Sequence, residues 1–230
     1  MNYKTVFIDL DDTLWDFHAN AKSSLQEIYE VKNLGQFFDS FEQYFTLYAK
    51  RNLELWEEYG KGTISKAELS LQRFQHPLIQ VGIDNAPLAK EIGDDYLTLL
   101  PSRTMLIPYA KELLEYLAPK YPLTIVSNGF VEVQYKKLHS CNIEHYFAHV
   151  VLSEAAQALK PDKRIFDYAL QLNNTTASKT IMIGDSYEAD IVGAQNARID
   201  QIYFNPNLKS NDTQASTYKV RSLSEIFNIL

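Results

Sequence analysis

Residues 5 to 13 read Thr-Val-Phe-Ile-Asp-Leu-Asp-Asp-Thr, an apolar, β-branched run that gives way at once to acids. Consecutive apolar positions of this length suit a strand that is covered on both faces of a sheet. Side chains alternate along an extended chain, so Asp9 and Asp11 are expected on the same side where the strand ends. The stretch predicts a buried strand whose carboxyl end, the edge at which open α/β sheets bind ligands, carries two carboxylates.

Similar apolar, strand-length runs recur in the second half of the chain. They occupy residues 123–126, 150–152, 180–183 and 202–204. Helix-length segments alternate with these runs, at residues 109–117, 162–172 and 187–197. Strands that alternate with helices are typical of a parallel sheet with helices on both faces. The chain is therefore predicted to be an α/β protein with a doubly wound, Rossmann-like parallel sheet.

Residues 18–100 interrupt this alternation. Aromatic and leucine side chains recur there near helical spacing, and Ser65 with Glu68 forms a capping box that starts a helix. We expect an all-helical domain at residues 18–100, inserted after the first strand of a core made of residues 1–17 and 101–230. The aromatic stripe suits the packing of facing helices better than it suits a membrane or partner surface.

The composition narrows the classes of function. The 230 residues carry a formal charge of −7 and no basic run, so polymeric nucleic acid is not an expected partner. The single cysteine, Cys141, excludes an internal disulfide and a thiolate metal cluster. The N-terminus lacks the apolar stretch of a signal peptide, and no run of about 18 apolar residues follows, so we expect a soluble, cytoplasmic protein without a membrane partner.

Further polar residues stand beside the predicted strands. Ser127 and Asn128 follow the second apolar run, Lys160 lies in a loop before a helix, and Asp185 follows the fourth run. Because the carboxyl ends of parallel strands meet at one edge of a sheet, these residues and Asp9 are predicted to form a single site.

The residue types of this predicted site match the needs of phosphoryl transfer. That reaction requires an oxygen nucleophile, an oxygen-ligated divalent cation, donors for the phosphoryl oxygens and a group that moves protons. Mg²⁺ prefers one or two carboxylates together with water and substrate oxygens, and Asp9 with Asp185 can supply them. Aspartate carboxylates also act as nucleophiles that form aspartyl-phosphates.

The ordered set of motifs resembles the haloacid dehalogenase-like (HAD) superfamily. Its motifs are an Asp-x-Asp-x-Thr after the first strand, a Ser or Thr that ends the second, a downstream Lys and a Gly-Asp-x-x-x-x-Asp. All four occur here in this order, from Asp9 to Asp190. The insertion at residues 18–100 stands where that superfamily places its helical cap.

The resemblance implies a role for each matching residue. Asp9 attacks phosphorus in line and becomes the aspartyl-phosphate. Asp11 protonates the leaving alcohol and then deprotonates the water that hydrolyses the intermediate. Ser127, with Asn128 beside it, binds the phosphoryl group, and Lys160 neutralises charge on that group and on Asp9.

The resemblance also implies a Mg²⁺ site and its support. Asp9, the backbone carbonyl of Asp11 and Asp185 would hold the ion. Asp190 would support the metal site from behind the direct ligands, and Thr13 would order the loop around the nucleophile.

Asp11 separates the chemistries found within such a superfamily. A dehalogenase attacks carbon, has no alcohol to protonate and needs no Mg²⁺, so an acid at this position favours phosphate esters over haloacids. A phosphomutase shares the acid and differs in how the cap excludes water, so it stays open as an alternative. A binding module without turnover is less expected, because such a module would usually have lost a catalytic carboxylate.

Three longer stretches resemble the pyrimidine 5'-nucleotidase subfamily. They lie at residues 9–17, 127–134 and 202–206. The resemblance implies that the small phosphorylated substrate is a pyrimidine nucleoside monophosphate such as dUMP, dTMP or a non-standard analogue. Phosphoglycolate and sugar phosphates stay open as alternative substrates.

Overall fold

The computed structural model describes residues 3–209 and 213–230, and the chain divides into two compact units. Unit 1 comprises Met1–Phe17 and Thr104–Leu230, and unit 2 comprises His18–Arg103. Among the described residues, no helix combines the length and the apolar character that crossing a membrane would require.

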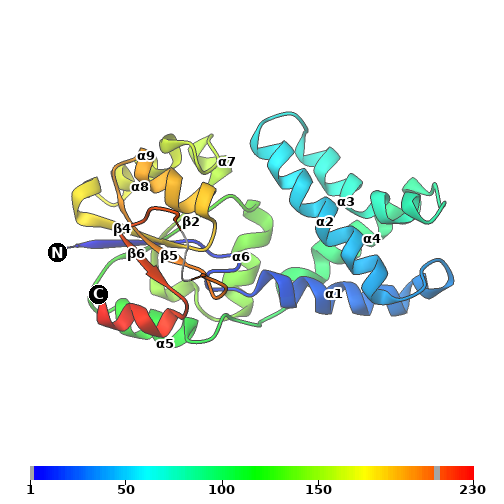
Figure 1. Cartoon of the computed structure of the whole chain (residues 1–230), viewed down its shortest axis with the longest axis horizontal. Helices are drawn as coiled ribbons and strands as arrows, with labels where there is room; N and C mark the ends of the chain where they lie inside the picture. Colours follow the sequence, from blue (N-terminus) through cyan, green and yellow to red (C-terminus); the bar gives the residue numbers. More distant parts are fainter. Residues whose placement is uncertain (1–2, 210–212) are drawn as a thin grey trace. The chain divides into compact units, whose positions relative to one another are not determined.

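Unit 1 is built on a parallel sheet with the strand order β3-β2-β1-β4-β5-β6 (Figure 1). Its strands are β1 (Thr5–Ile8), β2 (Leu123–Ser127), β3 (Phe147–Leu152), β4 (Thr180–Gly184), β5 (Asp200–Phe204) and β6 (Tyr218–Val220). In the central register, Ile8 of β1 pairs with Ile125 of β2 on one side and with Ile183 of β4 on the other. The strand order runs outward from β1 in both directions, so the topological switch point lies between β1 and β4.

Helices cover both faces of the sheet, and the predicted α/β class with a doubly wound sheet is confirmed. The α-helices of unit 1 are α5 (Ala110–Leu117), α6 (Val131–Ser140), α7 (Ser153–Ala156), α8 (Lys163–Leu172) and α9 (Gly193–Asn196). Phe7 and Met182 of the sheet share one buried cluster with Phe166 of α8. On the opposite face, α5 packs on the closing 3₁₀ helix η6 (Leu223–Asn228) (Figure 1). The ring centroids of Tyr116 in α5 and Phe227 in η6 lie 4.9 Å apart.

Several elements differ from the sequence-based expectation, among them a helix and a strand. The helix predicted at residues 187–197 is a π-helical turn, η5 (Tyr187–Val192), that continues into α9. π-turns place one extra residue in a turn and are frequent at functional sites. Strand β6 was not predicted, because its Tyr-Lys-Val sequence contains no sustained apolar run.

Unit 2 is helical. Its helices are α1 (Phe17–Val31), which starts one residue before the unit, α2 (Phe41–Gly60), α3 (Lys66–Gln80) and α4 (Ala86–Leu99), with short 3₁₀ turns η1 (Leu34–Gln36) and η2 (Leu100–Ser102). The aromatic stripe is buried between helices, since the Tyr48 ring stacks on Phe74 at 5.5 Å and its hydroxyl lies 2.7 Å from that of Tyr96. The predicted capping box of Ser65 and Glu68 is present at the start of α3.

Candidate active site

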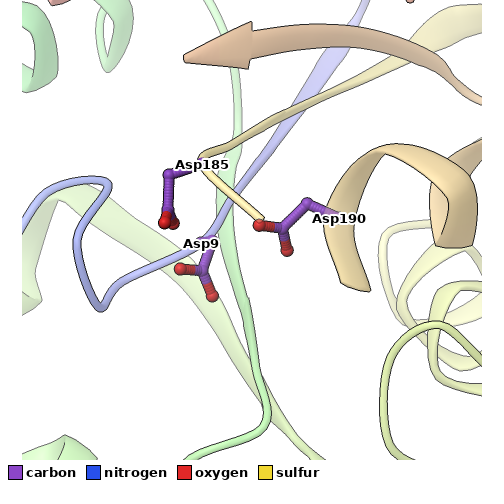
Figure 2. A group of neighbouring side chains, drawn as sticks. All are labelled: Asp9, Asp185 and Asp190. Carbon is purple, nitrogen blue, oxygen red and sulfur yellow. The ribbon is translucent and has the colours of Figure 1, made fainter. Parts of the chain in front are cut away.

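Three aspartates meet at the carboxyl edge of the sheet, beside the switch point. Asp9 follows β1, Asp185 follows β4, and Asp190 comes from the π-helical turn η5. One carboxylate oxygen from each lies within 4.8 Å of the other two, and the side chains converge from three separate segments (Figure 2). Asp9 and Asp190 are buried, and Asp185 is half-buried.

The backbone around this cluster explains why the carboxylates can approach one another. The Asp9 amide donates to the carbonyl of Ile183 at 2.9 Å, so the β1–β4 ladder continues one residue beyond the strand. A side chain at Gly184 would collide with the Asp190 carboxylate, so β4 must end in glycine for Asp190 to reach the site. The amide of Ser186 then donates to Asp190 Oδ2 at 3.0 Å and fixes its direction.

Lys160 supplies the positive charge inside the cluster. Its Nζ lies 2.6 Å from Asp9 Oδ1 and 2.6 Å from Asp190 Oδ1, and its side chain is buried. Asn128 holds the Lys160 backbone, accepting from its amide at 2.7 Å and donating to its carbonyl at 2.9 Å. The Asn128 side chain therefore places the lysine, and its predicted part in phosphate binding stays a prediction.

The electrostatics of the cluster favour a cation. Burial raises the pKa of Asp9 to about 7 despite the opposing charge of Lys160. Burial, followed by the charges of Asp9 and Asp190, raises the pKa of Asp185 to about 9. Burial alone would lower the pKa of Lys160, but the two carboxylates outweigh it and raise that pKa. Three carboxylates thus face one ammonium group, and a divalent cation suits both the excess negative charge and the all-oxygen donor set.

Thr13 joins the first loop to the end of β4. Its Oγ1 donates to Asp185 Oδ1 at 2.9 Å and accepts from the Asp185 amide at 3.1 Å. The hydroxyl is fully buried, so these two bonds define the rotamer of Asp185. This contact is consistent with the predicted ordering role, although it reaches Asp185 rather than Asp9.

Asp11 lies apart from the acid cluster in its contacts. Lys137 Nζ is 2.6 Å from Asp11 Oδ1, and Gln134 Nε2 donates to Asp11 Oδ2 at 2.8 Å. Gln134 also donates to Ser127 Oγ at 2.7 Å, and the Gly129 amide donates to the same oxygen at 3.2 Å. One amide group thereby links the predicted proton carrier to the predicted phosphate ligand.

Every residue predicted for the site lies in unit 1, but two residues that contact Asp11 were not predicted. Gln134 and Lys137 stand one turn apart on α6, a helix that the sequence did not predict. Lys137 follows another lysine and looks in the sequence like part of a solvated face. One feature of the sequence could have predicted their contact with the site. Gln134 and Lys137 are three residues apart in a segment that follows Ser127, and this spacing places both side chains on the same face of a helix.

Known proteins that are similar in sequence and structure include members of the family that the motifs of this chain resemble. The model of the haloacid dehalogenase-like hydrolase family matches residues 3–198. The protein YfnB of Bacillus subtilis (strain 168) is 33% identical over 99% of this chain and 95% of its own. A crystal structure of YfnB bound to magnesium has a TM-score of 0.90, at 30% identity, and the match covers all of this chain and 99% of that one.

Two nucleotidases are similar over the same length. Pyrimidine 5'-nucleotidase PynA of Streptococcus pneumoniae (strain ATCC BAA-255 / R6) is 33% identical over 100% of this chain and 96% of its own. Pyrimidine 5'-nucleotidase YjjG of Escherichia coli (strain K12) is 28% identical over 100% of this chain and 99% of its own. With the family model spanning most of both the sheet and the insertion, the chain belongs to the haloacid dehalogenase-like hydrolase family.

Proposed function

We propose that the protein is a Mg²⁺-dependent phosphatase that works through an aspartyl-phosphate on Asp9. One observation carries the proposal: two carboxylates that stand two residues apart have separate surroundings. Asp9 belongs to the buried acid cluster with Lys160, whereas Asp11 is held by Gln134 and Lys137. Separate environments suit separate roles, a nucleophile and a proton carrier.

Asp9 is placed to attack phosphorus. Among the described residues, its side chain is hydrogen-bonded by Lys160 alone, on Oδ1, which leaves Oδ2 for the reaction. The lysine charge opposes the effect of burial and favours the ionised, nucleophilic carboxylate. Mg²⁺, when held by Asp9, Asp185 and the backbone carbonyl of Asp11, supplies positive charge that stabilises the transferring phosphoryl group.

Asp11 balances the protons of the two half-reactions. In the first, a bond forms between Asp9 Oδ2 and phosphorus, the bond from phosphorus to the ester oxygen breaks, and Asp11 gives its proton to the departing alcohol. In the second, Asp11 takes a proton from water as the water oxygen bonds to phosphorus. The bond between phosphorus and Asp9 Oδ2 breaks, which restores the Asp9 carboxylate, and inorganic phosphate leaves.

Ser127 is oriented to bind the transferring group. Its Oγ accepts hydrogen bonds from Gln134 and from the Gly129 amide, so its own hydrogen points away from both donors. That hydrogen is available to a phosphoryl oxygen. Lys160, which touches Asp9 directly, neutralises charge on the same group.

For the substrate, we propose a pyrimidine nucleoside monophosphate such as dUMP or dTMP. The two relatives named pyrimidine 5'-nucleotidases match this chain over nearly their whole length, which includes unit 2. We assign catalysis to the core formed by residues 1–17 and 101–230, and substrate selection to a cap formed by residues 18–100. Aromatic side chains of such a cap can stack on a base.

Phosphate release from a panel of esters tests the proposal. The panel contains dUMP, dTMP, purine 5'-monophosphates, phosphoglycolate and sugar phosphates, each with Mg²⁺ and with EDTA. We expect Mg²⁺-dependent release that is fastest on dUMP or dTMP. Mg²⁺-dependent release that is fastest on another ester would keep the chemistry and reject the nucleotide assignment. Absence of release from every ester would reject the phosphatase itself, and following sugar phosphates by phosphorus NMR would then show whether the enzyme isomerises them as a mutase.

A further inference from the structure

Lys137 is a buried cation that stands outside the acid cluster. Its side chain is 3% exposed, and Asp11, whose side chain is 30% exposed, is the carboxylate that pairs with it, at 2.6 Å. The ammonium group also lies 4.3 Å from the ring centroid of Trp15 and 5.7 Å from that of Phe17. Burying an ammonium group is unfavourable unless its charge is paired, and the group that pairs with Lys137 is the carboxylate of Asp11.

The contacts of Lys137 restrict the Asp11 carboxylate to one direction. Lys137 occupies one lone pair of Oδ1, and Gln134 occupies one lone pair of Oδ2. A carboxylate offers about four lone-pair sites, so each oxygen keeps one site for a proton. Two donors that approach from α6 therefore fix the plane of the group without blocking proton transfer.

The two donors are themselves held rigidly. Gln134 and Lys137 are buried on the same face of α6, and the Gln134 side chain fills the space that a side chain at Gly129 would need. The Lys137 ammonium group lies over the ring of the fully buried Trp15, which pairs in an isolated bridge with Asp11. The loop that carries Asp11 and the helix that carries its donors thus form one packed assembly.

We propose that Lys137 is a positioning residue for proton transfer by Asp11, with Gln134 as the second hold on the same carboxylate. This inference rests on the proposed function, because it assigns Asp11 a proton to transfer. Lys137 does not touch the acid cluster, so its effect should be confined to steps in which Asp11 moves a proton.

The leaving group of the ester separates this role from a general structural one. The leaving group of an alkyl phosphate, such as a nucleoside monophosphate, is a basic alkoxide that needs a proton during phosphoryl transfer. The leaving group of p-nitrophenyl phosphate is a weakly basic phenolate that does not need one. Because kcat/KM reports only the steps up to formation of the phosphoenzyme, it isolates the dependence of this first transfer on the proton.

The experiment compares Lys137→Met, Lys137→Gln and the control Lys136→Met on both esters, at saturating Mg²⁺. Lys136 is the neighbouring exposed lysine on α6, so its substitution removes the same charge without touching Asp11. We expect Lys137→Met to lower kcat/KM for dUMP by about 10- to 100-fold and for p-nitrophenyl phosphate by less than about 3-fold. Lys137→Gln retains a donor and should recover part of the loss, and Lys136→Met should behave like the wild type.

A second readout concerns the hydrolysis half-reaction. Asp11 must also deprotonate water, whichever ester formed the intermediate. With p-nitrophenyl phosphate, Lys137→Met should therefore show a burst of p-nitrophenolate followed by slow turnover, as the phosphoenzyme accumulates. The Mg²⁺ concentration for half-maximal activity should stay at the wild-type value, since Lys137 pairs with the Asp11 side chain and not with the backbone carbonyl proposed to hold the ion.

The outcomes are distinguishable. An equal loss of kcat/KM on both esters, or an unchanged kcat/KM on dUMP, would overturn the positioning role while leaving the phosphatase in place. Wild-type enzyme that hydrolyses neither ester would overturn the proposed function and this inference with it. Unfolding of Lys137→Met would show as a lowered melting temperature. Lys137→Gln, which keeps a hydrogen-bond donor, would then decide between the two roles by the same ratio of kcat/KM on the two esters.

Discussion

Lys160 controls the charge balance of the acid cluster. It bonds Asp9 and Asp190 at equal distances, so each carboxylate shares one ammonium group. Asp185 has no such partner among the described residues and is instead hydrogen-bonded by the neutral hydroxyl of Thr13. The residue that most needs a cation is therefore Asp185, and its pKa is raised further than that of Asp9.

The nucleophile can be tested by a change of a single atom. Asp9→Asn is nearly isosteric, and its Oδ1 can still accept from Lys160, so the fold should be kept. An amide cannot form the phosphoenzyme, and we expect phosphate release to fall at least about 1000-fold. Mass spectrometry of the quenched enzyme should find the phosphoryl adduct in the wild type alone. Turnover at the wild-type rate in Asp9→Asn would disprove the assignment.

The charge on Asp185 should destabilise the metal-free protein at high pH. Folding raises its pKa from 3.8 to about 9, so the folded state holds the proton more tightly than the unfolded state does. The stabilisation from this bound proton is complete below pH 3.8 and is lost as the pH rises through about 9. At pH 8 in EDTA most of it is gone, whereas an Asn side chain has no proton to lose, so Asp185→Asn should raise the melting temperature by about 3–6 °C.

In EDTA at pH 8 we expect Asp185→Asn to be more stable than the wild type, and Mg²⁺ should make the wild type the more stable of the two. Mg²⁺ should stabilise the folded wild type by binding its carboxylates, whereas Asp185→Asn offers one carboxylate fewer and should gain less. Thermal unfolding of both proteins in EDTA and in Mg²⁺, from pH 5 to 8, makes the comparison. A variant that is less stable than the wild type in EDTA at pH 8 would contradict the destabilising role of this charge.

At the scale of elements, short helices and turns carry the site while the strands supply a fixed frame. Ile8 pairs with Ile183, and β4 runs one residue further than β1, so Asp9 and Asp185 follow the ends of two neighbouring strands. Asp190 comes from η5, a π-helical turn capped by Ser186. α6 contributes Gln134 and Lys137.

A capping box on each unit allows element stability to be measured separately. Ser65 caps α3 in unit 2, and Ser222 caps η6 in unit 1, each with a reciprocal glutamate. We expect Ser65→Ala to lower the free energy of unfolding by about 1 kcal/mol, because an amide of the first turn loses its partner. Hydrogen exchange should then increase in the helices of unit 2 and stay unchanged in the sheet.

The matched control for this change is Ser222→Ala. It removes the same kind of cap from unit 1, so hydrogen exchange should increase near α5 and η6 instead. Equal effects of Ser65→Ala on both units would show that the two units unfold as one cooperative body, contrary to the expectation.

At the scale of the whole molecule, unit 2 is an insertion whose two ends are joined within unit 1. Trp15 and Leu106 form an antiparallel bridge, and the Asp16 amide donates to the carbonyl of Met105 at 3.1 Å. The chain therefore leaves and re-enters unit 1 through adjacent, hydrogen-bonded segments. Every strand and every predicted site residue belongs to unit 1.

This arrangement predicts the result of removing unit 2. Replacing residues 18–103 by a short Gly-Ser linker should leave a cooperatively folding protein, because the bridge between Trp15 and Leu106 already joins the ends. The shortened protein should keep Mg²⁺-dependent hydrolysis of p-nitrophenyl phosphate and lose its preference for dUMP, since we assign selection to the cap. The same deletion with Asp9→Asn is the blank. A retained preference for dUMP would place substrate selection in unit 1.

Much of the fold could be predicted because its signals are local. Buried parallel strands need consecutive apolar residues, and β1, β2, β4 and β5 have them. The short β6 and the π-helical turn η5 have no such signal, because pairing and side-chain contacts stabilise them more than the sequence of the segment does. The helix α6 escaped prediction for a related reason: its buried face includes the polar side chains of Gln134 and Lys137.

The α/β class, the helical segment and the acids at the strand ends could be read from the amino-acid order, since apolar runs and the residues that follow them are properties of neighbouring positions. Which groups meet depends on contacts between distant segments. Lys160 joins Asp9 to Asp190, and Asp11 turns instead toward Lys137, more than a hundred residues away. Such pairings depend on which helix covers which strand end, and the free energy of burying charged groups then selects the partners that compensate one another.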